Sequence, residues 1–181
     1  MTKTDAPETP SPIRIDIISD VVCPWCIVGW KQLEQAIGQS GLGAIVRWHP
    51  FELNRDMPPE GQNLREHIVE KYGTSVEQSQ QARDRLSALG DELGFEFTFG
   101  DDSRMYNTFK AHLLLDWAGE FQLQHPLKLA LFKAYFTDGR DVSNDDVLTD
   151  VAASVGLDAM AARGVIDDPA RVAPLREKQV F

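Results

Sequence analysis

The sequence is poor in cysteine, in positive charge and in long apolar runs, and each shortage excludes a class of protein. Two cysteines among 181 residues are too few for a disulfide-stabilised scaffold. With 18 lysines and arginines against 28 aspartates and glutamates, the net charge is −10, so we expect neither nucleic acid nor membrane as a partner. No stretch approaches the roughly 20 consecutive apolar residues that a membrane-spanning helix needs.

The first 12 residues are polar and proline-rich, and they lack the apolar core of a secretory signal. We expect a flexible tail over residues 1–12. Together with the scarcity of cysteine, this favours a cytoplasmic protein. A periplasmic protein whose signal had been removed would have the same sequence features.

The tail is followed by a strand, a helix and a second strand. Residues 13–18 are β-branched and partly alternating, which is typical of a mostly buried strand. From Pro24 onward, apolar residues recur at helical spacing, at Cys26, Trp30, Leu33 and Ile37. Gly38 and Gly41 end this helix, and residues 44–48 form the next strand. A strand–helix–strand unit of this length favours two parallel strands.

Residues 57 to about 168 have a helical pattern almost throughout. Caps and first-turn prolines predict helices over 74–94, 107–118, 126–136 and 143–156, a short one from Asp158, and a last one from Asp168 to the C-terminus. The alternating segment 95–99 is either a short strand or an extended loop whose aromatic rings enter the helical core. The pattern therefore predicts an α/β unit interrupted by a helical block.

The segment Cys23-Pro24-Trp25-Cys26 falls at the first turn of the first helix. Pro24 suits the first helical position, which makes Cys23 the N-cap and places its sulfur beside unpaired backbone N–H groups. Because these donors stabilise a thiolate, we expect a lowered pKa for Cys23 and the role of attacking sulfur. Cys26 lies one turn further on, within reach of a disulfide, and is expected to be the resolving thiol.

Two alternatives to a redox role remain for this cysteine pair. The pair could be half of a zinc site, although the other candidate ligands lack zinc-site spacing: His49, His67, His112 and His125. The two thiols could also be buried and inert, for which an N-cap followed by a proline is a poor position.

Four motifs, in order, resemble the FrnE-like branch of the DsbA thiol–disulfide oxidoreductase family, and the resemblance runs from residue 13 nearly to 181. Beside the first strand and its Cys-Pro-Trp-Cys turn, they comprise segments 51–61, 107–112 and 131–141. The resemblance implies an α/β thioredoxin-like fold with an all-helical inserted domain. It divides the chain into the N-terminal half of the thioredoxin-like domain (13–56), a helical insertion (57–167) and a helix returning to that domain (168–181).

The resemblance also implies elements beyond the last predicted helix. Family members continue into a loop with a cis-proline beside the cysteine pair, two antiparallel strands and a closing helix. The C-terminal strands are missing from this sequence, and Pro169 and Pro174 fall in the last predicted helix. We therefore expect a sheet of two parallel strands, and we expect that the biological chain is longer or that a partner supplies the missing strands.

Substrate contacts are expected around the cysteine turn. Since parallel strands end at the same edge of a sheet, the segment after the second strand should approach Cys23. We therefore expect Pro24, Trp25, Phe51 and Asn54 to contact substrate, although Phe51 could instead be core and Asn54 a turn former. For Asn107 and His112 we favour structural roles, as a cap and as a satisfied helical histidine.

The sequence thus predicts a dithiol–disulfide oxidoreductase acting on protein or small-molecule disulfides through Cys23 and Cys26, without metal or bound cofactor. Glutathione is a candidate reductant or co-substrate, and oligomerisation is left open. No histidine lies between the cysteines and Asp20 is near, so we expect only a moderately lowered thiol pKa and a reductase or isomerase direction. The alternatives are a glutathione-dependent transferase, a 2-hydroxychromene-2-carboxylate isomerase and a non-catalytic binding module. Related enzymes with the first two activities usually carry serine in place of Cys23.

Overall fold

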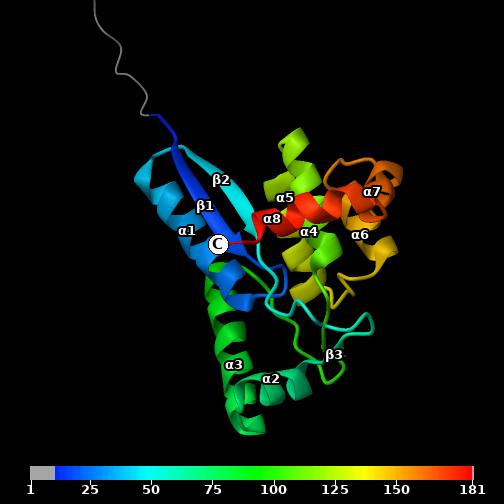
Figure 1. Ribbon diagram of the computed structural model, residues 1–181. Coiled ribbons are helices and arrows are strands. Elements are labelled where there is room, and N and C mark those ends of the chain that lie inside the picture. The colour runs from blue at the N-terminus through cyan, green and yellow to red at the C-terminus, as the bar shows by residue number, and fades with distance from the viewer. Residues whose placement is uncertain (1–10, 181) are drawn as a thin grey trace, which may run out of the picture.

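The structure is a computed structural model that describes residues 11–180. Most of the predicted tail, residues 1–10, and residue 181 lie outside the described residues. A two-stranded sheet with one long helix stands beside a larger group of helices, and α2 and α3 extend below both (Figure 1). The chain therefore has the predicted α/β architecture with a helical insertion.

The α/β part consists of β1 (Ile13–Ser19), α1 (Pro24–Ser40) and β2 (Ala44–Pro50). The strands are parallel, in a register that runs from Ile13 opposite Ala44 to Ser19 opposite Pro50. Helix α1 ends at Gly41, whose φ of 68° is a left-handed conformation that suits glycine. These three elements match the predicted ones in type and order, and within residues 11–180 this sheet has two strands. The prediction that the first strand is mostly buried was wrong, because Ile13 and Ile18 are 43% and 50% exposed.

The remaining elements are mostly helices, as predicted. In chain order they are β3 (Gln62–Asn63), α2 (Leu64–Tyr72), α3 (Val76–Leu93), β4 (Arg104–Met105), α4 (Phe109–Ala118), the 3-10 turn η1 (Gly119–Phe121), α5 (Gln124–Phe132), the π-helical turn η2 (Lys133–Thr137), α6 (Asp145–Ser154), α7 (Ala159–Ile166), the 3-10 turn η3 (Pro169–Arg171) and α8 (Val172–Lys178). The structure adds one short antiparallel pair, β3 with β4. The boundaries of the predicted domains stay predictions.

Local details differ from the expected ones at three helices. The capping box of α3 is formed by Ser75 and Gln78, one residue later than the Thr74 start of the sequence motif. Helix α5 begins at Gln124, two residues before Pro126. The predicted last helix is divided into η3 and α8. Each difference moves a helix end by a turn or less and leaves the order of elements unchanged.

Segment 95–99 is an extended loop rather than a strand. Its aromatic rings pack into the core, with the Phe97 and Phe136 centroids 5.2 Å apart. Gly90 permits this loop to lie against α3, because a Cβ there would be 2.3 Å from the carbonyl oxygen of Phe95. The alternation in the sequence therefore reflects packing of rings against helices and not pairing of strands.

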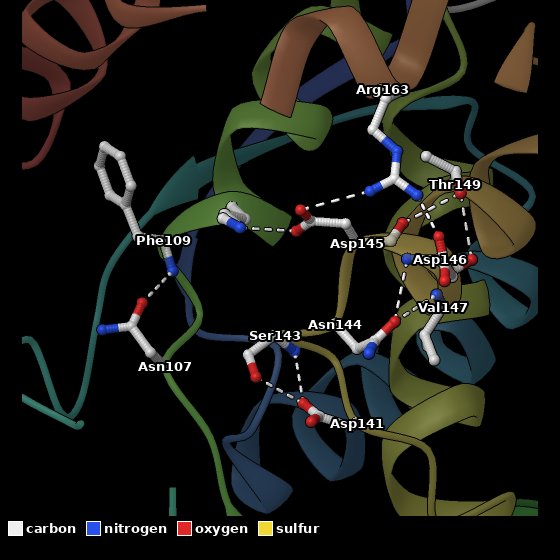
Figure 2. Close-up of polar contacts among 11 residues, drawn as sticks. Asn107, Phe109, Asp141, Ser143, Asn144, Asp145, Asp146, Val147, Thr149 and Arg163 are labelled. Atoms are coloured by element: carbon white, nitrogen blue, oxygen red, sulfur yellow. Dashed lines mark hydrogen bonds and ion pairs between the residues drawn. The ribbon is translucent and has the colours of Figure 1, made fainter. Parts of the chain in front are cut away.

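Capping and ion pairs join the helices of the insertion. The Asn144 side chain accepts hydrogen bonds from the backbone of Asp146 and Val147 and so starts α6 (Figure 2). Arg163 of α7 reaches Asp145 and Asp146 in the same view. On the other side, Lys110 of α4 pairs with Asp145 at 2.6 Å. Asp145 thus connects α4, α6 and α7.

Two apolar clusters meet at the turn between β1 and α1. The first joins the sheet, α1, α3 and α5, and its buried members include Ile27, Trp48 and Phe132. The second fills the helical insertion and includes Val21 and Val22 of the turn itself. Because both clusters hold this short segment, the start of α1 is fixed relative to both parts of the molecule.

Candidate active site

The cysteine turn has the predicted backbone geometry. Cys23 is the N-cap of α1, with extended φ and ψ of −91° and 108°, and Pro24 occupies the first turn. The Cys26 N–H donates to the Cys23 carbonyl oxygen at 3.1 Å. Both cysteines are free thiols and partly exposed.

The two thiols share one proton. The hydrogen bond from the Cys23 thiol to the Cys26 sulfur lowers the pKa of Cys26 to about 6, with further support from the Ser19 hydroxyl and the charge of Lys128. The same hydrogen bond, followed by burial and by the Cys26 charge, raises the pKa of Cys23. At neutral pH the pair therefore carries one thiolate and one proton.

This reverses the expectation that Cys23 would have the lowered pKa. The helix start does act in the expected direction, because the Cys26 backbone N–H lowers the pKa of Cys23. However, the Cys23 side chain forms no capping hydrogen bond, and the effects of Cys26 and of burial are larger. Sequence position gave the geometry of the N-cap, but it did not reveal which groups lie behind Cys26.

A buried carboxylate supports the turn from behind. The Asp20 oxygens accept hydrogen bonds from the N–H groups of Val21 and Leu53, each at 2.7 Å, and lie 3.3 Å from Nε2 of His112. Burial acts to raise the pKa of Asp20, but the hydrogen bond and electrostatic attraction of His112, with Leu53 and Lys128, outweigh it and lower the pKa. Asp20 therefore stays ionised and ties β1, the loop after β2 and α4 together.

Asp20, His112 and Lys128 of α5 form a buried floor behind the turn. Lys128 is 0% exposed. Its Nζ lies 3.4 Å from the Ser19 carbonyl oxygen, and 4.8 Å and 5.4 Å from the ring centroids of Phe132 and Trp48. Burial lowers the pKa of Lys128 to about 8, against the attraction of Asp20 and the two cysteines. A cation therefore faces the resolving sulfur from inside the protein.

A second hydrogen-bond pair holds α5, and with it Lys128, against the sheet. The side-chain amide of Gln124 accepts from the Trp48 N–H and donates to the Trp48 carbonyl oxygen, both at 3.0 Å. This contact occupies backbone groups of β2 that a further strand would use. The helix that carries Lys128 is thus fixed by backbone contacts to β2.

In front of the turn lies a cavity of about 330 Å³. Cys23 borders it, whereas Cys26 does not, and α2 and α3 form the opposite wall. Most of its lining is apolar, including Leu64, Ile68 and Leu86. This volume is within the range of small-molecule sites. Access through the cavity therefore favours Cys23 as the sulfur that meets a substrate.

Asn54 is held at the border of the cavity by α2. Its side-chain oxygen accepts from Lys71 Nζ at 2.6 Å and lies 3.0 Å from Nε2 of His67. Burial, followed by the charge of Lys71, lowers the pKa of His67. The loop after β2 is thus fixed to the helical insertion beside Cys23.

The structure brings most of the predicted substrate contacts together. Pro24, Trp25 and Asn54 line the cavity with Cys23, and Trp25 is 53% exposed. Phe51 is not part of the lining, and its exposure of 42% rules out the alternative that it is core. Which of these residues contact substrate stays a prediction.

Asn107 and His112 both have structural contacts, but the N-cap of α4 is Thr108 and not Asn107 as predicted. The Asn107 side chain accepts from the Phe109 N–H at 3.0 Å and donates to the Met57 carbonyl oxygen at 3.2 Å (Figure 2 shows the first contact). His112 is buried against Asp20. Its position under the cysteine turn was not expected.

Sequence reasoning missed Lys128 and Arg83, the two buried cations on either side of the turn. Lys128 shares a helix face with Phe132, four residues on, and this spacing was a usable signal for burial. Arg83 had no such signal, because its burial depends on how α3 lies against α2.

Among residues 11–180, no three histidine, cysteine, aspartate or glutamate side chains gather as a metal-binding group. No helix in the same range is long and apolar enough to cross a bilayer.

A dithiol at the start of the helix that follows the first strand of a parallel sheet defines a thioredoxin-fold protein. The chain belongs to the DSBA-like thioredoxin domain family, whose model matches residues 14–180. The members of this family are disulfide oxidoreductases. Its placement in the FrnE-like branch stays a prediction.

Comparison with individual proteins agrees with this assignment. The structure of a probable DsbA oxidoreductase, SCO1869 from Streptomyces coelicolor, is 32% identical and superposes with a TM-score of 0.84, covering 92% of this chain and 73% of that one. A curated relative, the uncharacterized protein YwbO of Bacillus subtilis (strain 168), is 28% identical over 156 residues, which is 86% of this chain and 72% of YwbO.

More distant structures share the fold. A 2-hydroxychromene-2-carboxylate isomerase superposes with a TM-score of 0.68 at 16% identity, covering 92% of this chain and 77% of its own. The cytosolic disulfide reductase DsbM from Pseudomonas aeruginosa has a TM-score of 0.63 at 16% identity, covering 92% and 75%. At this identity the likeness concerns the fold alone.

Proposed function

We propose that this protein is a thiol–disulfide oxidoreductase that acts on protein or small-molecule disulfides through the Cys23-Pro24-Trp25-Cys26 dithiol, in the reductase or isomerase direction. The observation that carries the proposal is the different surroundings of the two sulfurs. Cys23 borders the cavity, and Cys26 has a pKa lowered to about 6 and faces buried Lys128. Cys23 has access to the cavity, and the pair carries one negative charge at neutral pH.

The shared proton lets the pair react at neutral pH. As the Cys23 sulfur attacks one sulfur of a substrate disulfide, its proton passes along the hydrogen bond to Cys26. The substrate disulfide breaks, one substrate thiolate leaves, and a mixed disulfide with Cys23 forms. Cys26 then loses its proton, attacks Cys23 and releases the second substrate thiolate, so that two electrons pass from the dithiol to the substrate.

The proton that Cys26 must lose has an acceptor close by. With a pKa lowered to about 8, Lys128 is neutral in a fraction of molecules near neutral pH. When charged, it stabilises the Cys26 thiolate. In either form Lys128 favours the resolving step, acting as a positioning and electrostatic group behind the dithiol.

The thiolate pKa of the cysteine pair supports the reductase or isomerase direction. A value of about 6 is nearer to the ~7 of the thioredoxin nucleophile than to the ~3.5 of the strongly oxidising DsbA. A less stabilised thiolate makes the dithiol a better reductant. A cytoplasmic location, with glutathione as reductant or co-substrate, is consistent with the cytosolic disulfide reductase DsbM, of which a structure with glutathione is known.

The test is reduction of insulin by dithiothreitol with wild type, C23S and C26S. We expect wild type to accelerate insulin reduction, C23S to be inactive, and C26S to accumulate a mixed disulfide with substrate that mass spectrometry locates on Cys23. Equal activity of wild type and C23S would refute the proposal and leave a non-catalytic binding module.

A glutathione-dependent transferase or isomerase is the second candidate, because a cavity of small-molecule size adjoins Cys23 and a 2-hydroxychromene-2-carboxylate isomerase shares the fold. Such an enzyme would need Cys23 but not Cys26. Full activity of C26S with glutathione and a small electrophile, together with no insulin reduction by wild type, would favour this candidate.

A further inference from the structure

The cavity beside Cys23 differs in charge from the rest of the protein. The chain as a whole carries a net charge of −10. Among the described residues that line the cavity there is one arginine, Arg83, and no aspartate or glutamate. The cavity is therefore a locally positive site in an acidic molecule.

Arg83 is buried without a carboxylate partner. Arg83 is 8% exposed. Its guanidinium forms no ion pair with any carboxylate among residues 11–180. Its terminal nitrogens donate to the Ser79 hydroxyl at 2.8 Å and to the Gln80 side-chain oxygen at 2.7 Å. These are two of the five N–H donors of a guanidinium, and neither acceptor is charged.

Burial of an unpaired guanidinium is costly for a small protein. Burial, followed by the nearby Arg65, lowers the pKa of Arg83, whereas the charges of Asp84 and Asp101 act to raise it. Neither carboxylate forms an ion pair with Arg83, and an arginine stays charged throughout the physiological range. The two neutral acceptors orient the planar group from α3 without neutralising it. An anion that enters the cavity would gain a charge-assisted hydrogen bond that no residue of the protein provides.

The remainder of the lining limits what that anion can be. The volume of about 330 Å³ suits a small molecule and not a folded protein. The apolar side chains Leu64, Ile68, Leu86 and Phe99 leave few polar partners for a highly polar ligand. The preferred ligand thus has an apolar body and a single anionic group.

We propose that Arg83 binds the carboxylate of a small organic disulfide with an apolar body and so selects the substrates that reach Cys23. This inference rests on the proposed oxidoreductase function and specifies its substrate class. The covalent steps are those given above: Cys23 forms a mixed disulfide with one half of the substrate, Cys26 displaces it, and two carboxylate-bearing thiolates are released per dithiol oxidised.

Two aromatic disulfides that differ in charge test the proposal. The probe 5,5′-dithiobis(2-nitrobenzoate) carries a carboxylate on each ring, whereas 4,4′-dithiodipyridine is neutral. The single-turnover rates of the reduced protein with each probe are measured by stopped flow for wild type, R83Q and R85Q. Arg85 lies on the exposed side of the same helix, so R85Q changes the net charge equally without altering the cavity.

We expect R83Q to slow the reaction with the carboxylate probe by about tenfold, the effect of losing one charge-assisted hydrogen bond. The reaction with the neutral probe should stay within about twofold, and R85Q should leave both rates within about twofold. Equal slowing of both probes by R83Q would assign Arg83 a structural role and overturn the proposal. So would an unchanged rate with the carboxylate probe.

A measurement on wild type keeps the test independent of whether R83Q folds. Added 4-nitrobenzoate should slow the reaction of both probes by occupying the cavity, and 4-nitrobenzamide at the same concentration should slow neither. Equal inhibition by the two compounds, or by neither, would contradict the proposal. If wild type reacts with neither disulfide, the proposed function itself fails; if it reacts with both without dependence on Arg83, only the substrate class fails.

Discussion

The two sides of the cysteine turn differ in what they offer the sulfurs. Behind Cys26 lies a closed floor of ionised and ionisable groups, Asp20, His112 and Lys128, each buried and each with a partner in the protein. In front of Cys23 lies an open, apolar cavity whose cation, Arg83, has no carboxylate partner. The groups behind Cys26 pair with one another or with the backbone, whereas Arg83 donates only to neutral acceptors.

This difference indicates that the two sides of the cysteine turn have separate roles. The floor controls where the negative charge of the dithiol resides, and the cavity controls what reaches it. Changes in the floor should therefore alter stability and the pKa of the thiolate for every substrate. Changes in the cavity should alter rates for particular substrates and leave the pKa in place, as the Arg83 experiment requires.

The largest effect is expected for the floor carboxylate. Replacing Asp20→Asn removes the charge that faces His112 and Lys128 and leaves a poorer set of acceptors for two backbone N–H groups. We expect a loss of about 3 kcal/mol in the free energy of unfolding at pH 7, measured by urea denaturation, because a buried charge network loses a partner.

The pH dependence of this loss has a definite sign. Since the pKa of Asp20 is lowered in the folded state, its stabilisation is present above the unfolded value near 3.8 and is lost as the pH falls through the lower folded value. The difference between wild type and D20N should therefore shrink below about pH 4. The exposed Asp16, paired with Arg14 and His49, is the matched control, and D16N should cost less than about 1 kcal/mol. Similar losses for both variants would contradict the role of the floor.

A smaller effect is expected for the floor cation. In K128M the side chain keeps its length and its packing on Phe132 and Trp48 but loses the charge that helps to lower the pKa of Cys26. We expect the thiolate pKa to rise by about one unit. The measurement is the thiolate absorbance at 240 nm during a pH titration. K133M, at an exposed lysine paired with Asp138, should leave the titration unchanged. An unaltered midpoint in K128M would contradict the claim that the charge of Lys128 lowers the thiolate pKa.

The sequence was informative where short-range rules apply. Pro24 at the first helical position and glycine at 41 determined the bounds of α1, and β-branched residues with partial alternation predicted the first strand of the sheet. The position of Cys23 as N-cap followed from the same local rules. For these features, neighbours within a few residues supply most of the energetic preference.

The parts that escaped prediction depend on contacts between distant segments. Lys128 approaches Cys26 because Gln124 fixes α5 to the backbone of β2, and no local pattern around Cys26 contains that information. The cavity exists because α2 and α3 stand opposite the turn. The pKa order of the two cysteines differs from the expected one mainly because the two thiols interact with each other, with smaller effects of Ser19 and of the distant Lys128.

The central claim is that Cys23 reacts while the pair carries a thiolate with a pKa of about 6. The most direct test is the rate of iodoacetamide alkylation of the reduced protein between pH 4 and 10, with mass spectrometry locating the label. The account predicts a midpoint near 6 and the label on Cys23. A midpoint near 9, or a label confined to Cys26, would contradict it, and a midpoint below about 5 would contradict the reductase or isomerase direction.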